Sequence, residues 1–315
     1  MSLKSLDSRA IIGEFFLRLA QNPGSAWIDK VGMKFNTNQE TETYKWLGQV
    51  PAMREWLGGR NAKGLIDNGL SITSKTYEST LEIDVDELRR DKTGQAMIRI
   101  RELADRVNSH WAALLSTQIL NGTSTACYDG QFFFDTDHTE GKNTSSQSND
   151  ISVDVSAVPV SNHGSVTVPS VGEMNNAILQ GIQTILGFKD NESEPMNEGA
   201  RSYLVMVPTS LWHIAQGAVA MPVIDSQATN VMGALGMDIG VVANPRLTWT
   251  DSFAVFRTDG NAKPFILQSE VDPQVTAIAE GSELEFKENK HHYGVKAVRN
   301  VGYGFWQHAC YVTMT

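Results

Sequence analysis

The sequence predicts an α+β protein, and three observations support that fold class. A long helix is expected from about Thr93 to Asn121, because apolar side chains recur there at three- and four-residue steps. A long strand is expected over residues 70–85, where apolar and polar residues largely alternate. Shorter alternating or buried runs follow between residues 203 and 314. A chain that combines helices and strands in this way falls in the α+β class.

The composition is that of a globular protein that needs neither a metal nor a disulfide to fold. The chain has 315 residues, of which 41% are hydrophobic and 20% charged, and a chain of this length buries roughly three quarters of its unfolded surface. The net charge is 26 − 36 = −10, which argues against a dedicated nucleic-acid binder, whose affinity depends on Lys and Arg. Cys127 and Cys310 are too few for a disulfide framework and are expected to be reduced thiols.

The sequence has no signal for a membrane or for secretion. No stretch approaches the ~20 consecutive apolar residues that a membrane span needs. The first residues lack the apolar core and the cleavage site of a signal peptide. We therefore expect a chain that is made in a cytoplasm and has no membrane partner.

The first 85 residues contain elements with too few apolar residues for a core of their own. Residues 8–21 are expected to form a short amphipathic helix that ends at Asn22, and its apolar stripe needs a surface to lie on. Strand 70–85 changes its apolar phase after Ile72, which predicts a bulge or a change of neighbours. The aromatic residues of the surrounding polar, glycine-rich stretch need partners outside it, in this chain or another; they are Tyr44, Trp46, Trp56 and Tyr77.

The remaining elements follow from periodicity and turn residues. The helix at 93–121 is ~43 Å long at 1.5 Å per residue and is expected to act as a spine for other elements. Residues 139–149 contain no apolar side chain and are expected to form an exposed, mobile loop. Residues 151–155 and 166–168 are expected to pair as a hairpin. Further helices are expected at 171–186 and 208–220, and further strands at 203–208, 239–242, 253–256, 265–267 and within 291–314.

One cluster offers a catalytic interpretation: Asp129, Asp135, Asp137 and His138. Carboxylates and imidazole hold Mg²⁺ or Zn²⁺ and activate water, so a cytosolic metal-dependent hydrolase is the alternative function. The spacing is not that of a helix-borne ligand pair, and such residues beside a polar loop are common turn formers. The sequence also lacks the phosphate-binding and nucleophile motifs of common enzymes. We therefore assign no catalytic, cofactor-binding or metal residue, and expect no cofactor.

Three stretches of the sequence resemble the major head (capsid) subunit of Mu-like bacteriophages and prophages. The first is TYKWLGQVPAMREWLGGR at 43–60, which continues into LSITSKTYE at 70–78. The second is CYDGQFFFD at 127–135, with His138 after it. The third comprises VANPRL at 242–247, KPFILQ at 263–268 and GYGFWQ at 302–307. They occur in the order of the family and near its spacing, so the resemblance extends over nearly the whole chain.

The resemblance implies the Hong Kong 97-type capsid fold and its domain organisation. In that fold, residues 1–38 would form an N-terminal arm and residues 39–85 an extended loop. Residues 86–170 and 276–315 would form a peripheral domain that carries the spine helix, and residues 171–275 an axial domain. The weak N-terminal helix, the aromatic β excursion and the long helix match the arm, the extended loop and the spine.

The resemblance also implies a function: a major capsid protein that assembles into the pentamers and hexamers of an icosahedral shell around double-stranded DNA. The implied partners are other copies of the chain, a separate scaffolding protein, a portal and a decoration protein. Assembly would take place in a bacterial cytoplasm, and the product would be a virion. A cargo-holding compartment on the same fold remains an alternative. The candidate interface residues are Phe15, Phe16, Tyr44, Trp46, Arg54, Trp56 and Tyr77.

Overall fold

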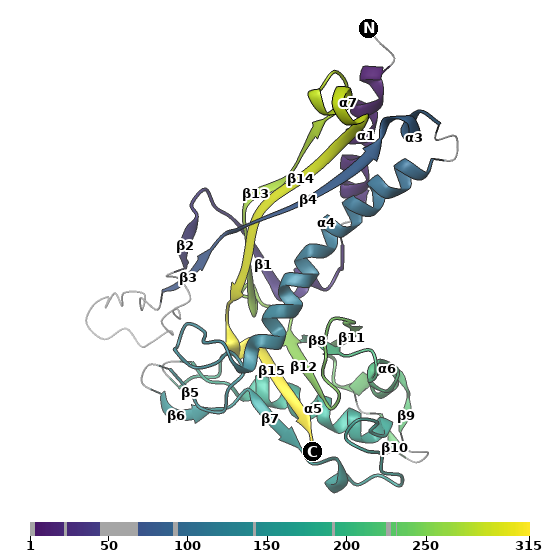
Figure 1. Ribbon diagram of the computed structural model, residues 1–315. Helices are drawn as coiled ribbons and strands as arrows, with labels where there is room; N and C mark the ends of the chain where they lie inside the picture. The colour runs from purple at the N-terminus through teal and green to yellow at the C-terminus, as the bar shows by residue number, and fades with distance from the viewer. Residues whose placement is uncertain are drawn as a thin grey trace, which may run out of the picture.

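The computed structural model describes residues 4–21, 24–44, 69–90, 94–140, 143–190, 193–224, 228–230 and 232–315. The molecule is elongated, with a long sheet at one end and a compact unit at the other, and one helix runs between them (Figure 1). The N-terminus lies at the far end of the long sheet, and the C-terminus lies in the compact unit.

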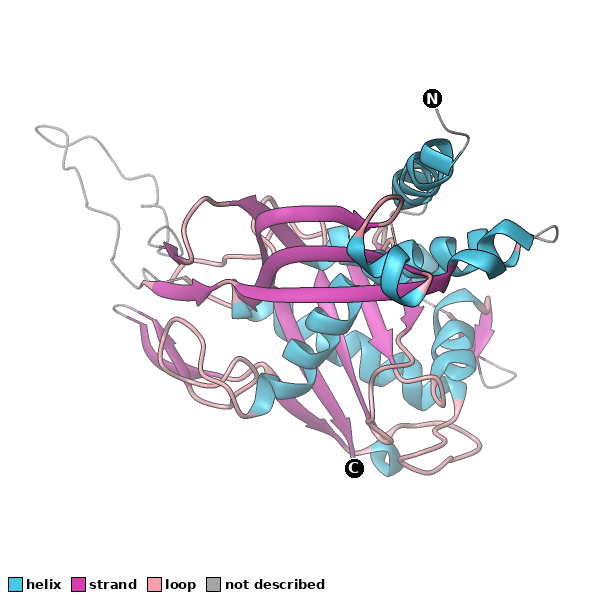
Figure 2. Ribbon diagram, turned by 45° about the horizontal axis from the view of Figure 1, so that its top comes forward, coloured by secondary structure: helices cyan, strands magenta, loops and turns pink. Residues whose placement is uncertain are grey.

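The long sheet has four strands in the order β1-β13-β14-β4. Strand β1 (Gly32–Asn36) pairs in parallel with β13 (Phe265–Ile278), whereas β14 (Lys290–Tyr303) is antiparallel to both β13 and β4 (Lys75–Asp84). Figure 2 shows the long strands of this sheet lying side by side across the molecule. The pairing of β13 with β14 shifts register between Ser269 and Gln274, a segment that contains a proline, which lacks the N–H needed for a regular ladder.

A two-stranded hairpin leads into this sheet. Strand β2 (Thr41–Tyr44) pairs antiparallel with β3 (Leu70–Thr73), and β4 begins after Ser74. The break between β3 and β4 lies where the apolar phase changes, so the predicted irregularity is confirmed. Tyr44 and Ile72 pack in a small cluster of buried residues with Ile266 and Phe305 of the same chain. The hairpin is therefore fixed to the body of the subunit at its base.

Helix α1 (Lys4–Gln21) lies along α4 (Gln95–Leu120). Its buried side chains, Ile11 and Phe15, share one core cluster with residues of α4, β4 and β14. Arg18 donates two hydrogen bonds to the Asp105 carboxylate, at 2.9 and 2.8 Å. The predicted apolar stripe of this helix thus packs against a surface of the same chain.

Helix α4 connects two hydrophobic cores. Its first half contributes Ile100, Leu103 and Val107 to the core under the long sheet. Its second half contributes Leu115 and Ile119 to the main core of the compact unit. With 26 residues it is about 39 Å long at 1.5 Å per residue, so the predicted spine helix is confirmed. The residue before its first turn, Gly94, has left-handed backbone angles.

The compact unit is built on a five-stranded sheet in the order β11-β8-β12-β15-β7. These strands are Asp238–Ala243, Ser202–Val207, Ser252–Arg257, Ala309–Met314 and Asp150–Val153, respectively. Helices α5 (Val171–Gly187) and α6 (Trp212–Ala220) pack on it and on each other. At Gly181 a Cβ would lie 3.0 Å from Val255 and 3.1 Å from Val312, so glycine lets α5 approach the sheet closely.

Short elements complete the part of the chain that the structure describes. Helices α2 (Ile28–Val31), α3 (Val85–Arg90) and α7 (Glu283–Glu288) border the long sheet, and four 3₁₀ turns, η2 to η5, occupy Asn121–Thr123, Val155–Ala157, Met232–Ala234 and Trp306–His308. Strands β9 (Val223–Ile224) and β10 (Ala228–Thr229) pair with each other. Within the described segments, no helix combines the length and the apolar character needed to cross a bilayer.

Two sequence-based expectations were wrong in detail, and one expected domain boundary falls within a strand. Most of residues 139–149 form strands rather than a loop: β5 (His138–Glu140) pairs with β6 (Asn143–Gln147), and because the two strands contain only polar residues, no apolar alternation marks them. Residues 151–155 do not form a hairpin with 166–168, because β7 pairs instead with the C-terminal β15. The expected boundary at 275/276 falls inside β13, and β15 joins the compact unit rather than the long sheet.

Candidate functional site

The cluster that offered a catalytic interpretation lies where the spine helix ends. The chain leaves α4 through η2 and makes a tight loop that is closed by an isolated bridge between Ala126 and Phe132. Within this loop, Asp129 Oδ1 accepts hydrogen bonds from the Gln131 N–H at 3.1 Å and from the Cys127 thiol at 2.9 Å. The loop geometry thus points the Asp129 carboxylate into the protein, where its side chain is 4% exposed.

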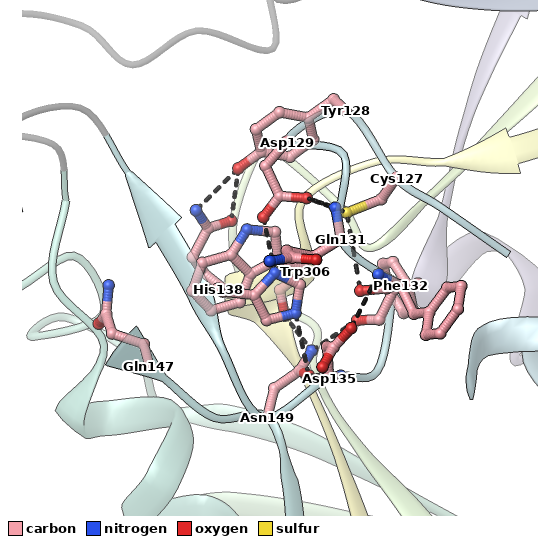
Figure 3. Close-up of polar contacts among 12 residues, drawn as sticks. Cys127, Tyr128, Asp129, Gln131, Phe132, Asp135, His138, Gln147, Asn149 and Trp306 are labelled. Atoms are coloured by element: carbon pink, nitrogen blue, oxygen red, sulfur yellow. Dashed lines mark hydrogen bonds and ion pairs between the residues drawn. The ribbon is translucent and has the colours of Figure 1, made fainter. Parts of the chain in front are cut away.

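The partner of Asp129 is His138, at the start of β5. Nδ1 of His138 lies 2.6 Å from Asp129 Oδ2, and its Nε2 lies 3.3 Å from Asn149 Oδ1. The imidazole stacks on the Trp306 ring with a centroid separation of 4.0 Å and an interplanar angle of 7°. Figure 3 shows the imidazole enclosed between these groups. The His138 side chain has no exposed surface, so water does not reach it.

Asn149 determines which atom donates in this network. Its Nδ2 donates to the backbone carbonyls of Phe133 and Trp306, at 2.8 and 3.4 Å, and its Oδ1 accepts from the Asp135 N–H at 2.9 Å. Since Oδ1 is an acceptor, His138 Nε2 must carry a proton and donate to it. The network therefore joins three segments: the loop after α4, the β5–β6 hairpin, and the η5 turn that connects β14 to β15.

The geometry is that of a hydrogen-bonded joint, and it does not fit a metal centre. Candidate ligand atoms of Cys127, Asp129 and His138 lie within 4.8 Å of one another. However, the His138–Asp129 contact of 2.6 Å is shorter than the roughly 3.3 Å that separates two ligands of a tetrahedral zinc with bonds of about 2.0–2.1 Å. Burial, reinforced by Asp129, raises the pKa of the Cys127 thiol far above its ordinary value. A metal needs the thiolate, which this environment disfavours.

Asp135 and Asp137 do not complete a catalytic site. Burial acts to raise the pKa of Asp135, but hydrogen bonds from the backbone N–H groups of Thr136 and Phe132 hold it below its ordinary value. The exposed Asp137 has a raised pKa because it hydrogen-bonds to Asp135. These two carboxylates therefore serve a turn at the surface, and the arrangement gives no support to the hydrolase interpretation.

The candidate interface residues fall into three groups. Phe15 and Tyr44 are 2% and 4% exposed and are packed within this chain, so they offer little surface to a neighbour. Phe16 is 43% exposed, and Tyr77 is half-buried with its ring against His110. The remaining three candidates lie outside the described residues; they are Trp46, Arg54 and Trp56.

The structure also reveals exposed apolar residues that sequence reasoning missed. Phe286 on α7 is 91% exposed, and Ile278 at the end of β13 is 54% exposed. Both lie at the far end of the β13–β14 hairpin (Figure 1). On the compact unit, Trp212, Met221 and Val223 are about half exposed. No sequence signal could have found Phe286, because one aromatic residue in a short charged helix looks the same whether it packs inward or outward.

Comparison with known proteins places the chain in a family. The sequence profile of the Mu-like prophage major head subunit gpT matches residues 13–159 and 234–315. The Mu-like prophage FluMu major head subunit of Haemophilus influenzae is 38% identical over 103 residues, which are 33% of each chain. The major capsid protein of Escherichia phage Mu is 33% identical over 110 residues, which are 35% of this chain and 36% of that one. Each match thus spans about a third of the curated relative.

A solved structure provides the fold. A chain in the procapsid of bacteriophage JBD30 superposes with a TM-score of 0.58 at 22% identity, covering 98% of this chain and 74% of that one. At this identity the likeness establishes the fold alone, and that fold is the Hong Kong 97-type capsid fold expected from the sequence. Together with a family profile that matches well over half of the residues, it leads to one conclusion: the chain belongs to the Mu-like prophage major head subunit family.

Proposed function

We propose that this chain is the repeating subunit of a phage or prophage head and assembles with copies of itself into a closed shell around double-stranded DNA. The observation that carries the proposal is the combination of family membership with a capsid fold shared with a procapsid protein. The family is one of structural head proteins rather than enzymes. The virion is accordingly the proposed location of the product.

The distribution of apolar side chains supports assembly. Large apolar residues of a globular subunit are mostly buried, yet this chain holds Phe286 and Ile278 outside the cores, at the end of a hairpin made of two 14-residue strands. Burying one phenylalanine side chain against a neighbour is worth roughly 2 kcal/mol. Many such modest contacts, repeated head to tail, close into rings when the rotation between subunits closes. Pentamers and hexamers are the rings we propose.

Each part of the fold has a proposed role in that shell. We assign the β2–β3 hairpin to the extended loop, the long sheet with α4 to the peripheral domain, and the five-stranded sheet with α5 and α6 to the axial domain. Phe16 and Tyr77 remain proposed contact residues because part of each ring is accessible. Trp46, Arg54 and Trp56 remain proposed contact residues on the strength of the family resemblance alone.

The proposed partners follow from the same reasoning. A separate scaffolding protein, a portal and a decoration protein are proposed for the assembly pathway. The net charge of −10 suits a container that encloses DNA without binding it tightly, because the chain repels the phosphate backbone.

Size-exclusion chromatography with light scattering, followed by negative-stain imaging of each peak, tests assembly. Rings, sheets or closed shells are the expected products. Phe286→Ala is expected to reduce their yield without lowering the melting temperature of the subunit, because the side chain packs on little of its own chain. Lys287→Ala on the same helix is the matched control and should assemble normally. A chain that stays monomeric at every salt and protein concentration, with and without a scaffolding protein, would contradict the proposal.

The contents of purified particles test the second half of the proposal. Nuclease-resistant double-stranded DNA inside particles from infected or induced cells is the expected finding. An enzyme cargo in place of DNA would instead identify a cargo-holding compartment built on the same fold.

A further inference from the structure

A small slot lies between the spine helix and the long sheet. It has a volume of about 150 Å³ and lies between the face of β4 and β14 and one side of α4. Four apolar side chains form its walls; they are Leu103, Val107, Val295 and Ala297. Tyr77, His110 and Arg299 also line it, and the exposed Arg106 and Glu78 lie at its edge. None of these residues belongs to the Asp129–His138 cluster.

Arg299 is a buried cation that forms no ion pair among the described residues, although the Asp272 carboxylate acts from farther away to raise its pKa. It is 4% exposed, its Nη2 donates to the Val107 carbonyl at 3.0 Å, and its guanidinium lies 4.9 Å from the Trp111 ring centroid. No carboxylate of the described residues forms an ion pair with it, and its Nε–H is buried without a hydrogen-bond partner. Burial accordingly lowers the pKa of Arg299 to about 10. A buried unpaired charge of this kind is costly.

His110 presents a second unpaired polar atom to the same slot. Its Nδ1 is buried and lacks a partner, and its ring lies 4.3 Å from that of Tyr77. Burial, with smaller contributions from Arg299 and Arg246, lowers the pKa of His110 to about 4. The imidazole is therefore neutral at pH 7, and in the tautomer that is protonated on Nδ1 it can donate to an acceptor in the slot. Two unsatisfied groups on two different elements thus line one cavity.

We propose that this slot is a binding site for a carboxylate, which accepts hydrogen bonds from Arg299 Nε and His110 Nδ1 while its apolar stem lies against the aliphatic walls. One negative charge matches the single buried guanidinium, whereas a dianion such as phosphate would bury a surplus charge. The exposed Glu78 does not fill this role, because it alternates with Tyr77 along β4 and so shares the opposite face with Thr80, whose hydroxyl donates to Glu78 Oε2 at 3.0 Å. Charge-assisted hydrogen bonds of this kind are the strong ones.

The carboxylate has two possible sources, and the slot itself does not depend on the proposed function. A free short-chain carboxylate fits the volume and the apolar walls. An acidic side chain of a second copy offers the same chemistry, and this second source rests on the proposed assembly into a shell. In either case the ligand joins α4 to the sheet and stiffens the contact between the spine helix and the strands.

Two measurements on the full chain distinguish these sources. Calorimetric titration of dispersed subunits with sodium butyrate, against sodium chloride at equal ionic strength, detects a free carboxylate. The protein concentration at which shells begin to form detects the second copy. Both are made on the wild type, on Arg299→Met, on His110→Phe, which keeps the ring but removes Nδ1, and on Lys296→Met as the matched control. Lys296 is exposed on the opposite face of β14.

Each outcome decides the proposal. Butyrate binding that weakens about tenfold or more in Arg299→Met and His110→Phe, but not in Lys296→Met, supports the free ligand. Absence of butyrate binding, together with a rise of about tenfold in the assembly concentration of the two slot variants alone, supports the second copy. If neither changes, the proposal is overturned. If the wild-type chain forms no shells, the proposed function fails, and the butyrate titration alone decides the slot.

Discussion

Adjacent residues Phe15 and Phe16 on α1 allow a test of whether this helix belongs to the folded subunit or to an arm. Phe15 is 2% exposed and packs in the core cluster with α4, β4 and β14, whereas Phe16 is 43% exposed. The two rings touch edge to face with centroids 5.7 Å apart. Replacing each in turn by alanine removes the same atoms from a buried position and from a largely exposed position of one helix.

The magnitudes follow from burial. Truncating a buried phenylalanine to alanine costs 3–5 kcal/mol, and because α1 lies at the outside of the subunit and can settle into the space, we expect about 3 kcal/mol for Phe15→Ala. For Phe16→Ala we expect about 1 kcal/mol, from the partly buried area and the aromatic contact. These values correspond to roughly 150-fold and roughly fivefold changes in the equilibrium for undocking α1 from α4.

Hydrogen exchange of the α1 amides in dispersed subunits measures that equilibrium directly. Protection is expected to fall by about two orders of magnitude in Phe15→Ala and by less than tenfold in Phe16→Ala. Shell formation should instead be impaired more by Phe16→Ala than by Phe15→Ala, because only Phe16 has surface to offer a neighbour. Equal losses of protection in the two variants, or a loss below about fivefold in Phe15→Ala, would refute the assignment of α1 to the folded unit.

Three further predictions concern buried contacts of single residues. Asp129→Ala leaves His138 buried without its partner and should cost about 3 kcal/mol of unfolding free energy in denaturant titrations. Glu173 is fully buried; burial acts to raise its pKa, but hydrogen bonds to backbone N–H groups and to a histidine hold it below the ordinary 4.5. The ionised carboxylate therefore adds to the free energy of unfolding above pH 4.5, and this stabilisation is lost as the pH falls through the lower pKa of the folded state. Glu173→Gln should accordingly be less stable than the wild type at pH 7, and its stability should fall less as the pH drops below 5. In Gly304→Ala, the new Cβ would lie 2.5 Å from the Lys263 carbonyl oxygen, which should cost about 3 kcal/mol in the same titration because backbone cannot rotate away.

Matched substitutions control each of these predictions. Asp137→Ala removes an exposed carboxylate of the same loop and should leave the denaturation midpoint unchanged. Glu198→Gln removes an exposed acid and should retain the acid sensitivity of the wild type. At Gly199 nothing lies within 4 Å of an added Cβ, so Gly199→Ala should be tolerated. A control that behaves like its partner variant would show that the buried contact is not the cause.

The elements that the sequence predicted best are those whose pattern is local. The apolar stripe of α4 and the alternation of β4 specify one face each. Helix α4 forms within two residues of its expected bounds, and the strand expected at 70–85 forms as two strands, β3 and β4, that together span residues 70–84. The phase change after Ile72 likewise marks the break between β3 and β4. Periodicity predicts such elements because the face that a side chain occupies depends only on its position along the element.

The pairing of distant strands escaped prediction for the opposite reason. Strand β7 pairs with β15, more than 150 residues away, and an alternating pattern carries no information about which partner completes a ladder. The polar β5–β6 hairpin lacked even that pattern. The candidate site illustrates the same limit: Asp129 and His138 were singled out together, but Asn149 and Trp306, which decide that the cluster is a buried joint, come from other segments.

The fold class, the spine helix and the family could be inferred from the chain alone, because periodic apolar patterns and ordered motifs are local features of a sequence. The environment of each polar or exposed side chain could not, because it depends on tertiary contacts. In the folded chain, His138 stacks on Trp306, Arg299 is buried without an ion pair among the described residues, and Phe286 is exposed. Burial and pairing depend on what other segments place around a side chain, and that arrangement exists only once the two sheets have folded against α4.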